Sequence, residues 1–263
     1  MEVQILSDAP NLEGLLMSKT IKIINAAFII IGDEILSGRT EDKNLNFLAK
    51  ELGNIGINLK EVRVVADDEK EIILAVNELR KKFDYVFTSG GIGPTHDDIT
   101  SASIAKAFKD DLIKHKRAEK ILISHYGPDK VNDARMKMAY VPSKAELLDN
   151  PVSSAPGFII ENVIVMAGIP KIMQAMFMSA KKHLKSGNKV LAKELKLSLV
   201  ESVIASDLAK LQEEFSNVSM GSYPFFGGTC LVFRSIDKEN LEKSFEKMVS
   251  LINSMHDNAI INE

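Results

Sequence analysis

The sequence predicts an α/β protein in which helices cover a parallel sheet, followed by a smaller α+β unit. Two observations carry this prediction. Up to residue 108 the chain alternates apolar, strand-like runs with stretches of helical periodicity, in the order β-α-β-α-β-loop-α. This alternation is typical of a parallel sheet covered by helices. From residue 188 the order changes to β-α-β-β-α, which indicates a second unit.

The elements of the first part end at glycines or where the periodicity changes. The run 21–31 is short, apolar and rich in isoleucine, which indicates a buried strand ending at Gly32. Further strands are expected over 58–65, 84–88, 157–161 and Val163–Met166. Helices are expected over 42–52, Glu69–Lys82, 98–108, 114–126, 133–139 and 170–184.

The second part is predicted in the same way. A strand is expected over 195–203 and a helix over 206–215, with Ser206 as its N-terminal cap. Strands over 217–223 and 229–235 and a closing helix over 237–255 follow. The predicted division is therefore an extension over 1–20 without assigned function, a main domain over 21–187 and a small α+β domain over 188–263.

Composition excludes several classes of function. The 263 residues carry a net charge of −3, too near neutral for a dedicated nucleic-acid binder. The longest apolar run, 26–31, is far below the roughly 20 residues that span a bilayer, so no membrane is expected. The single cysteine, Cys230, forms no disulfide within the chain and suits a reducing compartment, which predicts a cytoplasmic protein.

The densest group of chemically useful residues is the segment 88–100, between a predicted strand and helix. Its three glycines, Gly90, Gly91 and Gly93, would let a ligand approach the backbone and the helix N-terminus. Asp97 and Asp98 supply hard oxygen ligands for a divalent cation. A tight turn with an aspartate that caps the helix explains the same spacing about equally well.

A second acidic group follows the first predicted strand. Asp33 and Glu34 lie where that strand ends, and Asn44 follows them in the next predicted helix. Because parallel strands end at one edge of a sheet, both acidic loops could meet there around a cation and a phosphate ester. Taken alone, Asp33 is more simply a turn residue and Glu34 a solvated charge. Methionines 136, 138, 173, 176 and 178 are expected to fill gaps in the core.

Several strings make the sequence resemble the molybdopterin-binding domain superfamily, and within it competence/damage-inducible protein A and the N-terminal domain of eukaryotic FAD synthase. These strings are Gly32-Asp33-Glu34-Ile35-Leu36-Ser37-Gly38, Asn44, Gly90-Gly91-Ile92-Gly93-Pro94-Thr95 with Asp97-Asp98, Arg135-Met136-Lys137-Met138-Ala139, Pro156-Gly157-Phe158 and Gly168-Ile169-Pro170. The resemblance implies a three-layer, mostly parallel α/β fold. It also implies metal-dependent hydrolysis of nucleoside diphosphate compounds such as ADP-ribose or FAD, whereas more distant relatives bind molybdopterin.

The resulting expectation is a nucleotide pyrophosphatase that uses a divalent cation, Mg, Mn or Co. Asp33, Asp97 and Asp98 would hold the cation and carry catalysis. The residues expected to bind the nucleotide or pterin ligand are Gly90, Gly91, Gly93, Thr95, Asn44, Thr100 and Glu34. The alternatives are a binding module for molybdopterin or a nucleotide without turnover, and a structural remnant. Since relatives are commonly oligomeric, a homo-oligomer is expected.

Overall fold

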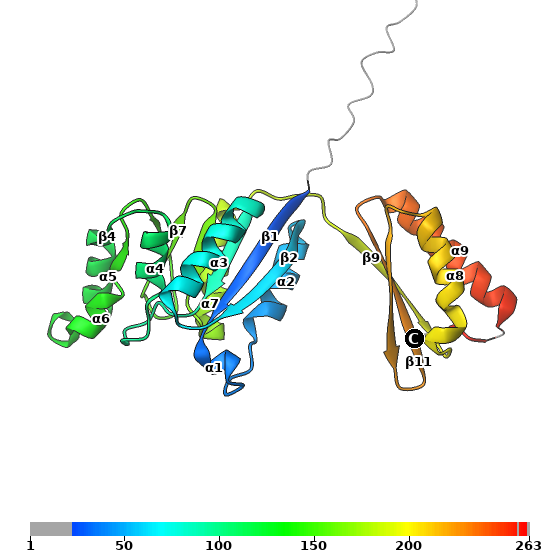
Figure 1. The fold of residues 1–263 in the computed structure, drawn as a ribbon, viewed down its shortest axis with the longest axis horizontal. Coiled ribbons are helices and arrows are strands. Elements are labelled where there is room, and N and C mark those ends of the chain that lie inside the picture. Colours follow the sequence, from blue (N-terminus) through cyan, green and yellow to red (C-terminus); the bar gives the residue numbers. More distant parts are fainter. Residues whose placement is uncertain (1–22, 257, 262–263) are drawn as a thin grey trace, which may run out of the picture.

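The computed structural model describes residues 23–256 and 258–261. The predicted extension over 1–20 lies outside these residues. Two units follow one another along the chain and lie beside each other, the larger one first (Figure 1). Within the described part, no helix combines the length and the apolar character needed to cross a membrane.

The larger unit is built on one six-stranded sheet with the order β2-β1-β3-β8-β7-β6. The first four of these strands run parallel to one another, β7 pairs antiparallel with β8, and β6 pairs antiparallel with β7 at the edge. The strands are β1 (Ile24–Ile31), β2 (Ile57–Val65), β3 (Tyr85–Ser89), β6 (Glu146–Leu148), β7 (Gly157–Ile160) and β8 (Val163–Met166). The sheet is therefore mostly parallel, as predicted.

Helices cover both faces of this sheet, which confirms the three-layer fold (Figure 1). On one face, α2 (Asn44–Asn54) and α7 (Pro170–Ala180) share a hydrophobic cluster with the sheet. On the other face, α3 (Glu69–Lys82), α4 (Thr100–Ala107) and α5 (Lys116–Tyr126) form a second cluster. The apolar stripes of these helices account for the burial on each side.

Short elements complete the larger unit. A two-stranded sheet pairs β4 (Leu112–Lys114) with β5 (Tyr140–Pro142), and neither strand, nor β6, was predicted from the sequence. Each has only three residues, and all three side chains of β4 are exposed, so no apolar alternation marks them. The remaining short helices are α1 (Asp33–Leu36), η2 (Pro128–Lys130), α6 (Asp133–Lys137) and η3 (Lys181–His183).

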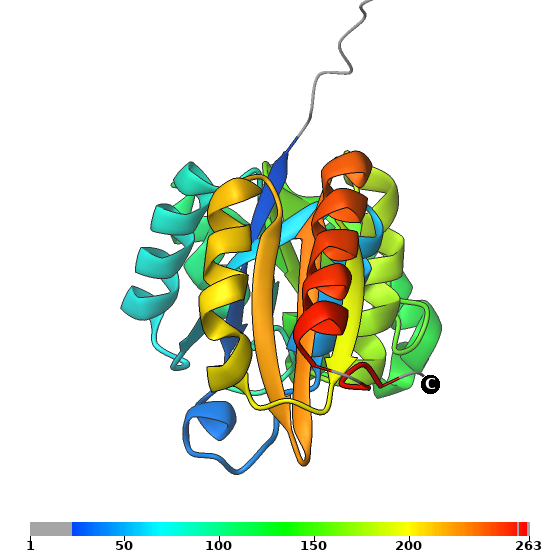
Figure 2. The same ribbon diagram turned by 90° about the vertical axis from the view of Figure 1, so that its right-hand side faces the viewer.

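The smaller unit is an antiparallel sheet of order β10-β11-β9 with two helices on one face (Figure 2). Its elements are β9 (Leu191–Leu197), α8 (Glu201–Glu214), β10 (Ser219–Phe225), β11 (Gly228–Ser235) and α9 (Lys238–Met255). Two predictions here were wrong. The strand ends at Leu197 and the helix begins at Glu201, so Ser206 lies inside α8 and caps nothing. The buried Ile204 and Leu211 lie at helical spacing on one face of α8. Because Ile204 precedes Ser206, the helix has to begin before Ser206.

The connection between the units is anchored to the larger one. The backbone N–H of Lys185 donates to the Tyr85 hydroxyl over 2.9 Å, and the N–H of Gly187 donates to the carbonyl of Ile55 over 3.1 Å. Gly56 has a φ of 74°, and a Cβ there would lie 2.3 Å from the Gly187 carbonyl oxygen. Only glycine therefore fits at this crossing.

Candidate functional site

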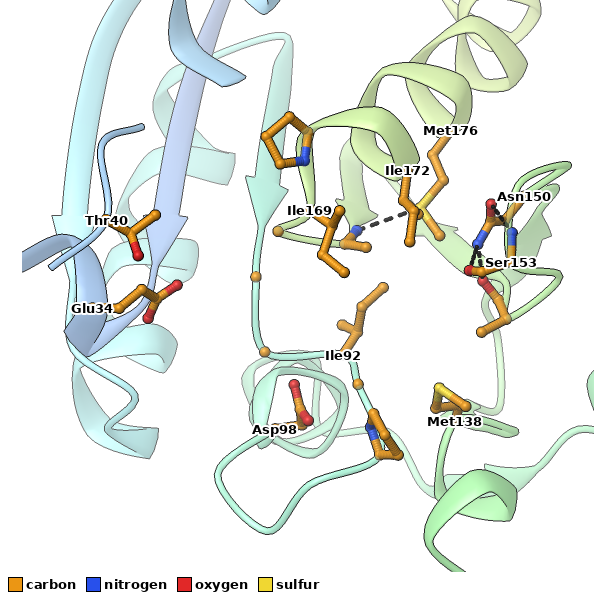
Figure 3. Close-up of a pocket in the computed structure, with 18 of the residues that line it drawn as sticks. Glu34, Thr40, Ile92, Asp98, Met138, Asn150, Ser153, Ile169, Ile172 and Met176 are labelled. Atoms are coloured by element: carbon orange, nitrogen blue, oxygen red, sulfur yellow. Dashed lines mark hydrogen bonds between the residues drawn. The ribbon is translucent and has the colours of Figure 1, made fainter. Parts of the chain in front are cut away.

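A cleft of about 560 Å³ opens where β1, β3 and β8 end (Figure 3). This is the edge at which ligands bind in open parallel sheets. The lining combines two acidic side chains, a glycine loop and an apolar wall. The lining residues are Glu34, Thr40, Gly90, Gly91, Ile92, Gly93, Pro94, Asp98, Tyr126, Met138, Asn150, Ser153, Ala155, Ala167, Gly168, Ile169, Pro170, Ile172 and Met176.

The glycine loop, Gly90–Gly93, has a backbone that side chains would not permit. Gly90 and Gly91 have φ values of 106° and 66°, in the left-handed region that favours glycine. A Cβ on Gly90 would lie 2.0 Å from the Ile31 carbonyl oxygen, and one on Gly91 would lie 2.2 Å from Oγ1 of Thr100. The loop therefore packs directly against the end of β1 and the start of α4.

Thr100 supports this loop from inside. Its side chain is fully buried, and its hydroxyl donates to the carbonyl of Gly90 over 3.0 Å. Its backbone N–H donates to the carbonyl of Gly91 over 2.9 Å. Thr100 is thus placed to shape the loop and not to touch a ligand in the cleft.

The N–H groups of the loop differ in what they can do. That of Gly90 donates to the carbonyl of Met166 over 3.1 Å, so it is already used inside the fold. Within the described part of the chain, the N–H groups of Gly91, Ile92 and Gly93 have no hydrogen-bond acceptor. These three are the groups that can face an anion in the cleft.

Asp98 lines the cleft and is held by its own loop. Its Oδ2 accepts hydrogen bonds from the backbone N–H of Thr95 over 2.8 Å and from the Thr95 hydroxyl over 2.5 Å. A Cβ on Gly93 would lie 2.7 Å from the same oxygen. Asp98 does not cap α4, because Ile99 occupies the cap position without a side-chain hydrogen bond. Asp97 points to solvent with 63% of its side chain exposed and is not part of the lining.

The first acidic loop reaches the cleft through Glu34. Glu34 and Thr40 lie on one side of the glycine loop, across from Met138 and Ser153 (Figure 3). A Cβ on Gly32 would lie 2.5 Å from Oε2 of Glu34, so the glycine makes room for this carboxylate. Asp33 is exposed and does not line the cleft.

Asp67, which follows β2, is an acidic residue that the sequence analysis missed. It accepts a hydrogen bond of 3.0 Å from the backbone N–H of Asp33. Burial raises the pKa of its carboxyl, the Asp33 N–H lowers it, and the negative charges of Glu34, Asp33 and Asp97 raise it further. The negative charges that follow β1, β2 and β3 therefore repel one another at this edge of the sheet.

Asn44 supports the opposite wall of the cleft. It is 3% exposed, and its Nδ2 donates to the carbonyl of Gly168 over 2.8 Å. Among the described atoms its Oδ1 has no partner. Asn44 therefore fixes the turn that follows β8, and its carbonyl oxygen is a buried acceptor without a donor.

The other half of the cleft is apolar. Ile92, Ile169, Ile172 and Met176 lie together above Met138 (Figure 3). Met176 is also buried in the core, as expected of a gap-filling methionine, whereas Met178 is 54% exposed and does not fill the core. Helical spacing alone could not separate a methionine that lines a cleft from one in the core.

The described residues contain no group of three or more His, Cys, Asp or Glu side chains placed to hold a metal ion together. The acidic edge is therefore not a preformed metal cage. A cation that binds Glu34 or Asp98 would need further oxygen ligands from another source, which is how Mg²⁺ is commonly held with substrate phosphates.

The protein-family model described as the probable molybdopterin binding domain matches residues 27–185 of this chain. This range is more than half of the chain and includes every residue that lines the cleft. The chain belongs to this family. The resemblance inferred from the glycine and aspartate strings is thereby confirmed. Residues 189–259 match a second model, the middle domain of FAD synthase.

The relatives of this chain extend over both units. A protein of Archaeoglobus fulgidus is 34% identical over 228 residues, which is 86% of this chain and 98% of that protein. A Clostridium botulinum (strain Kyoto / Type A2) protein, described as competence-damage inducible, is 34% identical over 244 residues. That alignment covers 87% of this chain but only 57% of the relative. The chain thus spans little more than half the length of such relatives.

A solved structure supports the same assignment. The protein CinA from Thermoplasma acidophilum, described as having unknown function, is similar with a TM-score of 0.59 and 36% sequence identity. The match covers 61% of this chain and 98% of that protein. The α/β fold of the family is therefore shared by a relative of known structure.

Proposed function

We propose that the cleft binds a nucleoside diphosphate compound of the ADP-ribose or FAD type and hydrolyses its pyrophosphate bond with the help of a divalent cation. The observation that carries this proposal is the two-part lining of the cleft. Unused backbone N–H groups and two carboxylates lie at one end, and an apolar wall lies at the other. A compound with a charged diphosphate and a flat ring matches both ends.

The glycine loop supplies the anion-binding part. The N–H groups of Gly91, Ile92 and Gly93 can donate to phosphate oxygens and stabilise the negative charge that develops on them. Thr100 holds this loop from inside, because its hydroxyl and its N–H donate to the carbonyls of Gly90 and Gly91. The backbone is thus held ready before the ligand arrives.

The carboxylates supply the cation-binding part. Glu34 and Asp98 line the cleft and present hard oxygen ligands, with Asp33, Asp67 and Asp97 beside them. When bound, the cation would polarise a phosphoryl oxygen and lower the pKa of a water molecule. Asp98, fixed by Thr95, would orient the diphosphate relative to the loop.

One observation favours the second candidate, a module that binds a nucleotide or molybdopterin without turnover. The apolar wall would accept a pterin ring as well as adenine or flavin.

The experiment that separates the two candidates is a turnover assay combined with a binding assay. The purified chain is incubated with ADP-ribose and with FAD in the presence of Mg²⁺, Mn²⁺ or Co²⁺, and AMP is measured by chromatography. The pyrophosphatase proposal expects AMP that disappears when a chelator is added. No AMP with any cation, together with a higher melting temperature in the presence of molybdopterin, would favour the binding module.

A further inference from the structure

Lys137, the last residue of α6, contacts the loop that carries Asp98. Its ammonium group donates a hydrogen bond to the backbone carbonyl oxygen of Thr95, 42 positions away in the sequence. The same carbonyl accepts the N–H of Asp98 over 3.3 Å. One carbonyl group therefore joins α6 to the turn on which Asp98 sits.

The two hydrogen-bond donors of Thr95 both reach Asp98, and its hydroxyl also lowers the pKa of the Asp97 carboxyl. The N–H and the hydroxyl of Thr95 both donate to Oδ2 of Asp98, over 2.8 and 2.5 Å. Thr95 is thus held by Lys137 through its carbonyl and holds Asp98 through its two donors. A movement of the Thr95 peptide would change the direction of the Asp98 carboxylate.

Lys137 acts from outside the cleft. A separate hollow of about 40 Å³ lies against the same loop and is lined by Lys137 and Tyr140 as well as by Asp98 and Gly93. Lys137 is absent from the lining of the cleft. Its ammonium group is therefore placed to support the loop and not to touch a ligand in the cleft.

The neighbours of Lys137 support the apolar wall in a similar way. Met138 lines the cleft directly. The guanidinium group of Arg135 lies 4.3 Å from the centre of the Tyr126 ring, and Tyr126 also lines the cleft. The end of α6 therefore contacts both the acidic loop and the apolar wall.

We propose that Lys137 is a positioning residue for Asp98, acting through the Thr95 carbonyl. The inference deepens the proposed pyrophosphatase function and rests on it for its catalytic consequence. Loss of the Lys137 donor leaves the Thr95 peptide held by fewer bonds, and the Asp98 carboxylate samples more directions. Small misplacements of this kind lower a chemical rate by roughly tenfold to a hundredfold and affect ligand binding less.

The test combines two measurements on the full chain. Amide hydrogen exchange reports whether the Thr95 N–H is still held by Asp98, whether or not the protein is an enzyme. Steady-state AMP release from ADP-ribose reports kcat and KM. Lys137→Met removes the donor, and Lys137→Arg restores a charged donor. Lys130→Met, at an exposed lysine of η2, is the matched control.

In Lys137→Met we expect Thr95 exchange at least about tenfold faster and kcat at least about tenfold lower, with KM changed less than threefold. The arginine variant and the control should stay within about twofold of the natural chain in both measurements. Unchanged Thr95 exchange in Lys137→Met would overturn the proposal. If Lys137→Met does not fold, Lys137→Leu, which also lacks a donor, takes its place under the same criteria. If the natural chain releases no AMP, the proposed function fails while the exchange measurement still decides the positioning role.

Discussion

The backbone N–H of Asp33 donates a hydrogen bond of 3.0 Å to Oδ2 of Asp67, so a carboxylate ties the end of β1 to the end of β2. Asp67 lies in an acidic setting, and burial is the first cause of its raised pKa. A carboxyl with a raised pKa in the folded state favours folding most when it is protonated. Its contribution to stability is therefore complete at low pH and is lost as the pH rises through the folded-state pKa.

Replacing Asp67 by Asn should therefore stabilise the protein at neutral pH. The Asn side chain keeps an acceptor for the Asp33 N–H but removes the partly buried negative charge. We expect a melting temperature higher by roughly 2 °C at pH 7, a small effect because solvent screens this partly exposed group. The gain should shrink towards pH 4. Calorimetric melting of both proteins at several pH values measures the difference in melting temperature and its pH dependence. A difference that becomes larger as the pH falls would contradict the assigned role of the Asp67 charge.

Asp98→Asn tests the acidic end of the cleft. The Asn carbonyl can still accept from Thr95, so the melting temperature should hardly change. The rate of AMP release should fall at least about a hundredfold, because one electrostatic contributor to the transition state is removed. Asp111→Asn is the control, since Asp111 is exposed and outside the cleft lining. Full activity of Asp98→Asn in the same assay would remove Asp98 from the site.

Gly91→Val tests the glycine loop. The new Cβ would meet Oγ1 of Thr100 and disturb the hydroxyl that holds the Gly90 carbonyl. We expect loss of nucleotide binding in calorimetric titration, along with lower stability. Gly227→Ala is the matched control, because Gly227 has a φ of 92° with open space around its Cβ position. It should cost about 1 kcal/mol of stability and leave binding unchanged. Normal affinity in Gly91→Val would show that the loop is only a turn.

A shortened chain that ends at Gly187 tests the independence of the two units. All residues of the cleft lining precede this point, and so do all members of the two larger hydrophobic clusters. We expect it to fold and to retain nucleotide binding. Light scattering should show a homo-oligomer for the full chain and reveal whether the smaller unit contributes to it. A folded, shortened chain without affinity would mean that residues of the removed unit, such as Tyr223 of β10, belong to the site.

The main elements of the fold could be predicted because their signals are local. The α3 helix was predicted with its observed bounds, since its apolar residues repeat at helical spacing. The wrong prediction of Ser206 as a helix cap has a local cause as well. Serine is a common cap, but the apolar stripe of α8 begins before it, and burial of that stripe decides the helix start. The short strands β4, β5 and β6 had no pattern to detect.

The site was predicted only in part, for a reason that Asp67 and Lys137 illustrate. Glu34, Asp98 and the glycines of the loop belong to recognisable sequence motifs, and the structure brings them to one cleft. Asp67 precedes Asp68, which caps α3, so the pair looks like an ordinary helix start. Its contact with Asp33, like that of Lys137 with Thr95, depends on distant segments meeting in space. No local pattern encodes such contacts.

The anchored connection at Gly187 has a consequence for how such chains can change over evolutionary time. Each hydrophobic cluster draws its buried members from one side of this connection only. A genetic recombination event at this point would carry away one complete core and leave another complete core behind. The two units can therefore be joined or separated at the contact between Gly56 and Gly187 without any change in the hydrophobic core of either unit.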